Sequence, residues 1–178
     1  MAITRTLVLG GQRSGKSHYA EQLVTASGCA PVYLATGTAG DGEMAERIAA
    51  HRQRRGGGWR TVEVPLDLAA TLVRETHSHA VVLIDCLTLW LTNLMAAERN
   101  IDDESAGLVT ALRQVRGSVV IVTNEVGSGI IPANALARRY ADALGTLNQQ
   151  VAAAADRVVF MAAGLPLVLK PSEGEASP

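Results

Sequence analysis

The sequence has no excess of basic charge. Its 178 residues include 16 Lys and Arg against 17 Asp and Glu, which gives a formal net charge of −1. Proteins that bind duplex DNA or RNA usually present a strong positive field, because they must neutralise phosphates. Nucleic acid is therefore a poor candidate for a partner of this chain.

Long apolar runs are also missing. The longest, Ala80–Leu91, is interrupted by Asp85 and is shorter than the roughly 20 residues that a membrane helix needs. Near the N-terminus the run Leu7–Leu9 is too short for a secretory signal. These absences predict a cytoplasmic protein that does not insert into a membrane.

Cysteine is scarce. Cys29 and Cys86 are the two cysteines of the chain, and their spacing does not suit a metal site. Both lie beside expected buried strands, where a free cysteine behaves as a small hydrophobic residue. We expect a reducing compartment and neither a disulfide nor a zinc site.

Apolar strand-like runs alternate with helical patterns along the chain. The expected strands are residues 5–9, 31–35, 59–64, 80–85, 118–123, 157–162 and 165–170. The expected helices are residues 16–26, 43–55, 67–77, 87–98, 102–116 and 134–155. The alternation predicts a single α/β domain over residues 1–170 with a mostly parallel sheet flanked by helices. Residues 171–178 are small, polar and acidic, which predicts a disordered tail.

Three local details follow from the same patterns. Pro166 predicts that the last strand lies at a sheet edge. Asp102 and Asp103 are expected to cap the helix that follows them. The last helix is expected to bury one apolar face, made of Leu136, Tyr140, Leu144, Leu147 and Val151.

A glycine-rich motif stands between the first strand and the first helix. Gly10-Gly11-Gln12-Arg13-Ser14-Gly15-Lys16-Ser17 matches the pattern Gly-x-x-x-x-Gly-Lys-Ser. In that context the backbone N–H groups wrap an anion, the Lys reaches the β- and γ-phosphates, and the Ser hydroxyl binds magnesium. A coincidental turn is the alternative, but the flanking strand and helix argue against it. The sequence therefore predicts a P-loop that binds a nucleoside triphosphate and Mg²⁺.

Asp85 ends an apolar strand and is the candidate second magnesium ligand. P-loop proteins use such a carboxylate to hold the ion directly or through water. The alternative is a strand-terminal Asp that caps the next helix.

One histidine lies among arginines in the sequence Ala50-His51-Arg52-Gln53-Arg54-Arg55. An imidazole near a nucleotide can act as a base or can itself attack phosphorus, and guanidinium groups grip phosphate oxygens. The alternatives are a solvated histidine and a basic helix end that complements the helix dipole. Glu63 and Glu125 are weaker candidates, since each could simply decorate a loop.

Taken together, the motifs resemble one known family over about residues 5–170. They are Gly10–Ser17, Tyr33-Leu34-Ala35-Thr36, the segment 43–52, Trp59-Arg60-Thr61-Val62-Glu63 and Thr123-Asn124-Glu125-Val126-Gly127, in this order. The set is similar to the bifunctional adenosylcobinamide kinase/adenosylcobinamide-phosphate guanylyltransferases of cobalamin biosynthesis.

The resemblance implies two reactions on a RecA-like P-loop NTPase fold. ATP or GTP would phosphorylate adenosylcobinamide, and GMP would then pass from GTP through a GMP-histidine intermediate to the phosphorylated corrinoid. His51 matches the guanylylated histidine. The implied nucleotide contacts are Gly10, Gly11, Gln12, Arg13, Ser14, Gly15, Lys16, Ser17, Ala35, Thr36, Gly37, Arg52, Gln53, Arg54, Arg55, Glu63 and Asp85. The resemblance also implies a homotrimer.

The sequence differs from the family pattern at two places, and alternative functions are weighed against the one that the family implies. Asp85 stands where some relatives have Glu, and the stretch 96–107 matches nothing that can be assigned. A P-loop small-molecule kinase with an idle His51 is the nearest rival. A GTP-dependent switch is disfavoured because the chain lacks Asn-Lys-x-Asp.

Overall fold

One seven-stranded sheet organises the part of the chain that the structure describes, residues 3–37, 53 and 55–171 of a computed structural model. The strand order is β3-β2-β4-β5-β1-β6-β7. The strands are β1 Arg5–Gly10, β2 Ala30–Ala35, β3 Arg60–Glu63, β4 Ala80–Asp85, β5 Ser118–Val122, β6 Arg157–Ala162 and β7 Leu165–Lys170. Neighbours pair in parallel, except that β7 runs antiparallel to β6 and forms one edge.

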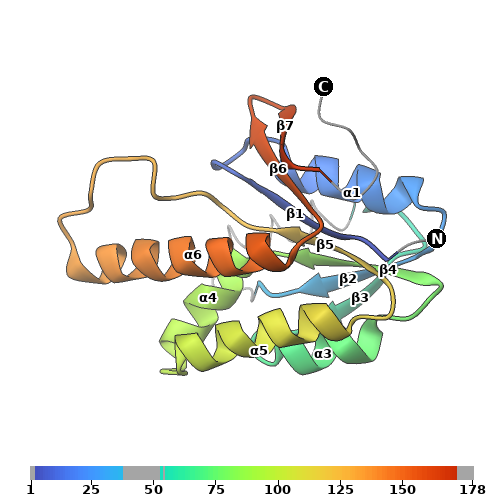
Figure 1. Ribbon diagram of the computed structural model, residues 1–178, viewed down its shortest axis with the longest axis horizontal. Helices are drawn as coiled ribbons and strands as arrows, with labels where there is room; N and C mark the ends of the chain where they lie inside the picture. The colour runs from blue at the N-terminus through green and yellow to red at the C-terminus, as the bar shows by residue number, and fades with distance from the viewer. Residues whose placement is uncertain (1–2, 38–52, 54, 172–178) are drawn as a thin grey trace.

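Helices cover both faces of this sheet (Figure 1). They are α1 Lys16–Ala26, α3 Leu68–Glu75, α4 Leu87–Ala96, α5 Ile101–Gln114 and α6 Ala135–Ala154. Helix α1 lies on one face, and α3, α4, α5 and α6 contribute to the core on the other. The mostly parallel sheet with flanking helices confirms the architecture expected from the alternating pattern.

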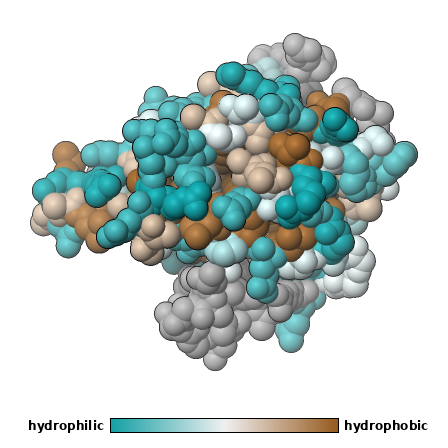
Figure 2. All heavy atoms as spheres, turned by 90° about the horizontal axis from the view of Figure 1, so that it is seen from below, coloured by the Kyte–Doolittle hydropathy of each residue, from teal (hydrophilic) through white to brown (hydrophobic). Residues whose placement is uncertain are grey.

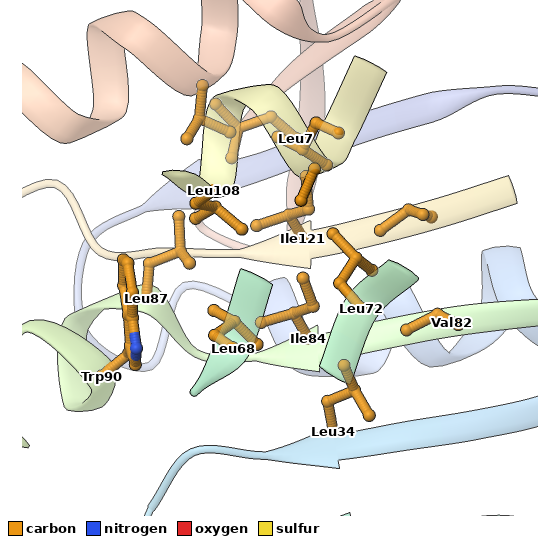
Figure 3. Close-up of a cluster of buried hydrophobic side chains, with 14 of the residues drawn as sticks. Leu7, Leu34, Leu68, Leu72, Val82, Ile84, Leu87, Trp90, Leu108 and Ile121 are labelled. Atoms are coloured by element: carbon orange, nitrogen blue, oxygen red, sulfur yellow. The ribbon is translucent and has the colours of Figure 1, made fainter. Parts of the chain in front are cut away.

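The larger core explains why β4 reads as a continuous apolar run. All six residues of β4 are buried, because the strand is central and is covered on both faces. Ile84 and Ile121 point from the sheet toward Leu72 of α3, Leu108 of α5 and Trp90 of α4 (Figure 3). The indole of Trp90 is fully buried, and its Nε1–H donates to the carbonyl oxygen of Leu66 at 2.7 Å.

The element boundaries agree with the sequence patterns to within a few residues. Helix 16–26 and strands 80–85, 157–162 and 165–170 coincide with α1, β4, β6 and β7. The helix expected at 67–77 is shorter, Leu68–Glu75, and the one expected at 87–98 ends at Ala96. Most of the helix expected at 43–55 lies outside the described residues. The tail expected at 171–178 also lies outside them, apart from residue 171.

The prediction that Asp102 and Asp103 cap helix α5 was wrong. Asn100 occupies the cap position, and its side chain accepts from the backbone N–H groups of Asp102 and Asp103 at 3.1 and 3.3 Å. Asp102 and Asp103 instead lie in the first turn, where their charge complements the helix dipole. The unassigned stretch 96–107 is therefore the end of α4, a short connection and the start of α5.

The prediction of a buried apolar face on the last helix was wrong for its first residue, Leu136. Leu144, Leu147 and Val151 are buried, but Leu136 is 64% exposed. Helix α6 has 20 residues, about 30 Å at 1.5 Å per residue, which is longer than the sheet it packs on. Its N-terminal end projects beyond the sheet in Figure 1, which agrees with the exposure of Leu136 in the first turn.

The two cysteines also differ from each other. Both are free, and Cys86 is buried as expected, whereas Cys29 is only partly buried. Neither forms a disulfide.

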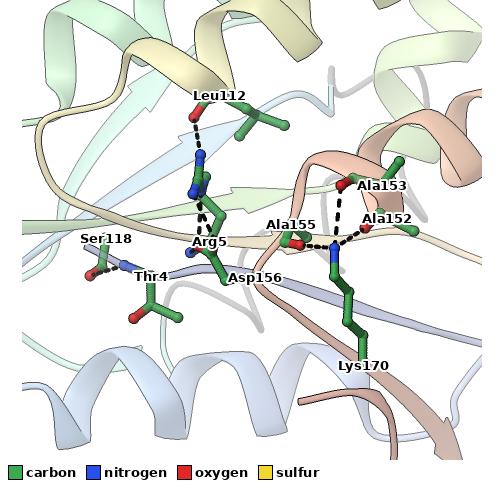
Figure 4. Close-up of polar contacts among 9 residues, drawn as sticks. All are labelled: Thr4, Arg5, Leu112, Ser118, Ala152, Ala153, Ala155, Asp156 and Lys170. Atoms are coloured by element: carbon green, nitrogen blue, oxygen red, sulfur yellow. Dashed lines mark hydrogen bonds and ion pairs between the residues drawn. The ribbon is translucent and has the colours of Figure 1, made fainter. Parts of the chain in front are cut away.

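Ionic contacts tie the first and last parts of the chain together at the amino-terminal edge of the sheet (Figure 4). Arg5, the first residue of β1, forms an ion pair with Asp156 at 2.7 Å, and its backbone N–H donates to the same carboxylate. Lys170 of β7 donates to the carbonyl oxygens of Ala152, Ala153 and Ala155 at the end of α6. These contacts stabilise the fold at the amino-terminal edge of the sheet. The sequence motifs lie at the opposite, carboxyl edge.

Within the described residues, no helix combines the length and the hydropathy that a membrane span requires.

Candidate active site at the carboxyl edge of the sheet

The P-loop connects the end of β1 to the start of α1. Gly15 precedes the helix with a left-handed backbone (φ +97°), a conformation that glycine adopts without strain. Lys16 is the first helical residue and is only 7% exposed. Its Nζ donates to the carbonyl oxygen of Gly11 at 2.5 Å and lies 3.5 Å from Oγ of Ser14. The lysine is therefore folded back over its own loop.

Burial is the main cause that lowers the pKa of Lys16, while the negative charge of Asp85, at the end of β4, acts in the opposite direction. The ammonium group thus lies within electrostatic range of the end of β4. A buried cation beside a loop of backbone N–H groups is suited to bind a polyanion, because phosphate oxygens would replace its present partners.

Neighbouring loops brace the P-loop on two sides. The backbone N–H of Glu125, just after β5, donates to the carbonyl oxygen of Gly10 at 3.0 Å. The N–H of Gly164, in the turn between β6 and β7, donates to the carbonyl oxygen of Ser14 at 3.0 Å. Two strands that flank β1 therefore hold the loop in place.

Asp85 lies at the carboxyl end of β4, opposite Ala35 of β2 and Val122 of β5. It is 9% exposed, and Oδ2 accepts a hydrogen bond from the Tyr33 hydroxyl at 3.1 Å. Cys86, the next residue, holds the cap position of α4 and makes no side-chain cap hydrogen bond. Asp85 therefore precedes the cap position and does not occupy it.

Ser17 and Asp85 offer a hydroxyl and a carboxylate, the hard oxygen donors that Mg²⁺ prefers. No group of three or more His, Cys, Asp or Glu side chains that could hold a metal occurs among the described residues. A magnesium ion at a P-loop normally takes only one or two protein ligands and completes its shell with phosphates and waters. The donor set therefore fits Mg²⁺ bound together with a nucleotide.

Thr36 locks the end of β2 to the end of β4. Its fully buried hydroxyl donates to the carbonyl oxygen of Cys86 at 2.7 Å and accepts from the Cys86 N–H at 2.8 Å. Its carbonyl oxygen accepts from the side-chain amide of Asn93 in α4 at 2.7 Å. Ala35, the residue before Thr36, pairs with Asp85 across the two strands.

Arg55 brings part of the basic cluster to the same edge. Its guanidinium carbon lies 3.4 Å from the centre of the Tyr33 ring and 5.9 Å from the centre of the Trp59 ring. The Nη1 atom of Arg55 is buried and has no hydrogen-bond partner among the described residues. A buried guanidinium nitrogen without an acceptor is suited to take an oxygen of a ligand.

The structure brings together most of the predicted site residues that it describes. The P-loop Gly10–Ser17, the segment 35–37, Arg55 and Asp85 all lie at the carboxyl edge of the sheet. Glu63 ends β3 beside Ala35 and is exposed. Gln53 is exposed, and its carbonyl oxygen accepts from the Gly56 N–H at 3.2 Å. His51, Arg52 and Arg54 lie outside the described residues.

Glu125 has a structural explanation. Its carboxylate accepts from the backbone N–H groups of Gly127 and Ser128 at 2.7 and 3.3 Å. Glu125 therefore shapes the loop after β5, as the loop-decorating alternative expected.

Sequence reasoning missed Tyr33. It lies within the quoted Tyr33–Thr36 motif but reads as an ordinary member of a buried strand. Only its contacts with Asp85 and Arg55 mark it as part of the site.

The loop between β5 and α6 exposes several large hydrophobic side chains. They are Val126, Ile130 and Ile131, and Leu136 in the first turn of α6 is exposed as well. Figure 2 shows hydrophobic side chains among hydrophilic ones on the arm at its left, which corresponds to the projecting end of α6 in Figure 1.

A solved structure shares this fold. The RadB recombinase superposes with a TM-score of 0.53 at 16% identity, over 88% of this chain and 73% of its own. At that identity the likeness concerns the fold alone, and it supports the RecA-like P-loop NTPase architecture that the sequence predicted.

Close sequence relatives cover nearly the whole chain. The bifunctional adenosylcobalamin biosynthesis protein CobP of Pseudomonas aeruginosa is 50% identical over 168 residues, 93% of this chain and 97% of its own. The bifunctional adenosylcobalamin biosynthesis protein CobU of Salmonella typhimurium is 40% identical over 181 residues, 92% of this chain and 98% of its own.

The family model described as cobinamide kinase / cobinamide phosphate guanyltransferase matches residues 6–169. This match extends from the first strand of the sheet to the last. It includes the P-loop, Arg55 and Asp85, which lie at one edge of the sheet. The chain belongs to the cobinamide kinase / cobinamide phosphate guanyltransferase family.

Proposed function

We propose that this protein phosphorylates adenosylcobinamide with ATP or GTP and then transfers GMP from GTP to the adenosylcobinamide phosphate so formed. The products are adenosylcobinamide-GDP and pyrophosphate. Family membership supports both reactions. The single observation that carries the nucleotide chemistry is the buried Lys16, folded over the P-loop within electrostatic range of Asp85.

In the kinase reaction, the P-loop residues Gly10–Ser17 bind the phosphates. Lys16 exchanges its bonds to Gly11 and Ser14 for the β- and γ-phosphate oxygens. Ser17 and Asp85 would hold a magnesium ion, which would offset negative charge on the phosphates. The corrinoid hydroxyl oxygen forms a bond to the γ-phosphorus and loses its proton to water. The bond to the β-phosphate oxygen breaks, and the nucleoside diphosphate leaves.

In the guanylyl transfer, His51 acts as the nucleophile. A ring nitrogen of the neutral imidazole attacks the α-phosphorus of GTP, and the bond to the pyrophosphate oxygen breaks. An oxygen of adenosylcobinamide phosphate then attacks the same phosphorus and releases His51. Arg52, Arg54 and Arg55 offset the charge on the pyrophosphate leaving group.

The remaining nucleotide contacts are assigned to residues around this edge. They are Ala35, Thr36, Gly37, Gln53 and Glu63. Support comes from the position of Ala35 between Asp85 and Glu63 on the neighbouring strands. The buried Nη1 of Arg55, which lacks an acceptor among the described residues, supports the same assignment.

The proposed setting is a cytoplasmic homotrimer whose substrates are small molecules, with neither nucleic acid nor membrane as a partner. The balanced charge of the chain supports the exclusion of nucleic acid. A P-loop kinase without guanylyl transfer is the second candidate, because the kinase half needs only the described residues Gly10–Ser17 and Asp85.

The experiment that tests the proposal is covalent labelling. The protein is incubated with magnesium and GTP labelled at the α-phosphate, denatured, and examined for bound label. We expect acid-labile, base-stable label on the wild type, no label in His51→Ala, and no label from γ-labelled GTP. Wild-type protein that takes no α-label would exclude a GMP-histidine intermediate and leave the kinase alone.

A further inference from the structure

Three side chains from separate parts of the chain meet at the carboxyl edge of the sheet. Tyr33 comes from β2, Asp85 from the end of β4, and Arg55 from the segment before β3. The tyrosine lies between the other two, because its hydroxyl contacts Asp85 and its ring contacts Arg55.

The hydroxyl of Tyr33 holds one oxygen of Asp85. The O–H donates to Oδ2 at 3.1 Å. This bond orients the carboxylate through Oδ2.

The ring of Tyr33 supports Arg55. The guanidinium carbon lies 3.4 Å from the ring centre, which is cation–π contact. Trp59 packs against the same ring edge-on, with centroids 6.4 Å apart and an interplanar angle of 76°. The guanidinium thus lies against both rings, and its buried Nη1 has no hydrogen-bond partner among the described residues.

We propose that Tyr33 is a positioning residue that holds Arg55 and Asp85 in the geometry needed for one bound nucleotide. The inference rests on the proposed nucleotide site and assigns a role to a residue that the motif reasoning passed over. Tyr33 acts through its two neighbours and touches no substrate. Its ring stacks on Arg55, and its hydroxyl contacts Asp85 and also interacts with Arg55. A variant that keeps the ring therefore tests the hydroxyl alone, and a variant without the ring tests both groups.

The test measures binding of α,β-methylene GTP, whose α–β bridge blocks transfer of GMP, by calorimetry with Mg²⁺ and with EDTA. Tyr33→Phe keeps the ring and loses the hydroxyl. We expect unchanged affinity in EDTA and about a fivefold loss of the affinity that Mg²⁺ adds. Tyr33→Leu loses both groups, and we expect the Kd in EDTA to rise about tenfold as well.

A double-mutant cycle with Arg55→Ala separates positioning from general stability. If Tyr33 acts through Arg55, adding Tyr33→Leu to Arg55→Ala changes the Kd in EDTA by less than about twofold. Tyr140→Phe is the matched control, since the Tyr140 hydroxyl also donates in a partly buried bond, to the Thr88 carbonyl oxygen at 2.9 Å. We expect this control to bind like the wild type in both buffers.

Contrary results would be distinct. Additive effects of Tyr33→Leu and Arg55→Ala would show that Tyr33 acts only on the fold, and Tyr33→Phe matching Tyr140→Phe would remove its role at Asp85. If Arg55→Ala binds like wild type while Lys16→Ala loses binding, the P-loop site stands and the inference about Tyr33 fails. If Lys16→Ala also binds like wild type, the proposed nucleotide site itself is wrong.

Discussion

The backbone N–H of Glu125 donates to the carbonyl oxygen of Gly10 at 3.0 Å, which joins the loop after β5 to the first residue of the P-loop. Gly10 is also the last residue of β1, paired with Met161 of β6. The start of the phosphate loop is thus held between the two strands that flank β1, and a side chain at Gly10 would collide with Met161 of β6.

Gly10→Ala is expected to destabilise the protein by about 2 kcal/mol or more. A Cβ at this position would lie 2.4 Å from the backbone oxygen of Met161 and 2.8 Å from Oγ of Ser14, so the backbone of β6 would have to shift. Gly11→Ala is the matched control, since nothing lies within 4 Å of its added Cβ. Urea unfolding measures both, and equal losses in the two variants would contradict the packing argument.

Asp156→Asn is expected to lower the free energy of unfolding by about 1–2 kcal/mol at pH 7, because it weakens the ion pair with Arg5. The side-chain hydrogen bond from Arg5 is the main cause that holds the pKa of Asp156 below its ordinary value. This stability is present above the unfolded-state pKa of about 3.9 and is lost as the pH falls through the lower folded-state pKa.

The difference between the wild type and Asp156→Asn should therefore shrink in acid. Urea unfolding at pH 7 and at pH 3 measures it. Asp142→Asn is the control, since Asp142 is exposed and the structure shows no ion pair of its side chain within the described residues. A difference at Asp156 that grows toward low pH would contradict the assignment.

The two cysteines are expected to react at very different rates with a thiol reagent such as dithionitrobenzoate. Burial is the main cause that raises the pKa of the Cys86 thiol to about 11, so only about 0.1% is thiolate at pH 8. Cys29 is partly buried, and its thiol is free. We expect Cys86→Ser to keep one reactive thiol and Cys29→Ser to react only after unfolding.

Spectrophotometric titration of the native and urea-unfolded variants at pH 8 checks this expectation. Fast reaction of native Cys29→Ser would show that the end of β4 opens readily to solvent. That result would also weaken the description of Asp85 and Thr36 as parts of a closed, fixed edge.

Much of the fold could be predicted from local patterns. The continuous apolar run of β4 indicates a strand covered on both faces, and the alternation of strands and helices indicates a parallel sheet. Sequence patterns gave wrong predictions where the burial of a residue depends on what surrounds its helix or strand. Leu136 continues the apolar periodicity of α6, but it extends past the sheet and is exposed.

Some residues of the candidate site could likewise be predicted from the sequence, and others could not. Gly10–Ser17 is a contiguous motif whose function depends on its own backbone, so the sequence alone predicts a phosphate loop. Asp85 could be predicted as a magnesium ligand because it is the last residue of an apolar strand. Tyr33 could not, because nothing in its own neighbourhood along the chain marks it as different from other buried strand residues.

The sequence by itself therefore determined the P-loop, the alternating elements and the family resemblance, because these depend on residues that are neighbours along the chain. The tertiary structure decided which carboxyl ends lie side by side and which side chains meet there. Tyr33 and Asp85 are 52 positions apart and become partners only because β2 and β4 are adjacent in the order β3-β2-β4-β5-β1-β6-β7. Strand order is set by packing of the whole sheet, and no local pattern carries it.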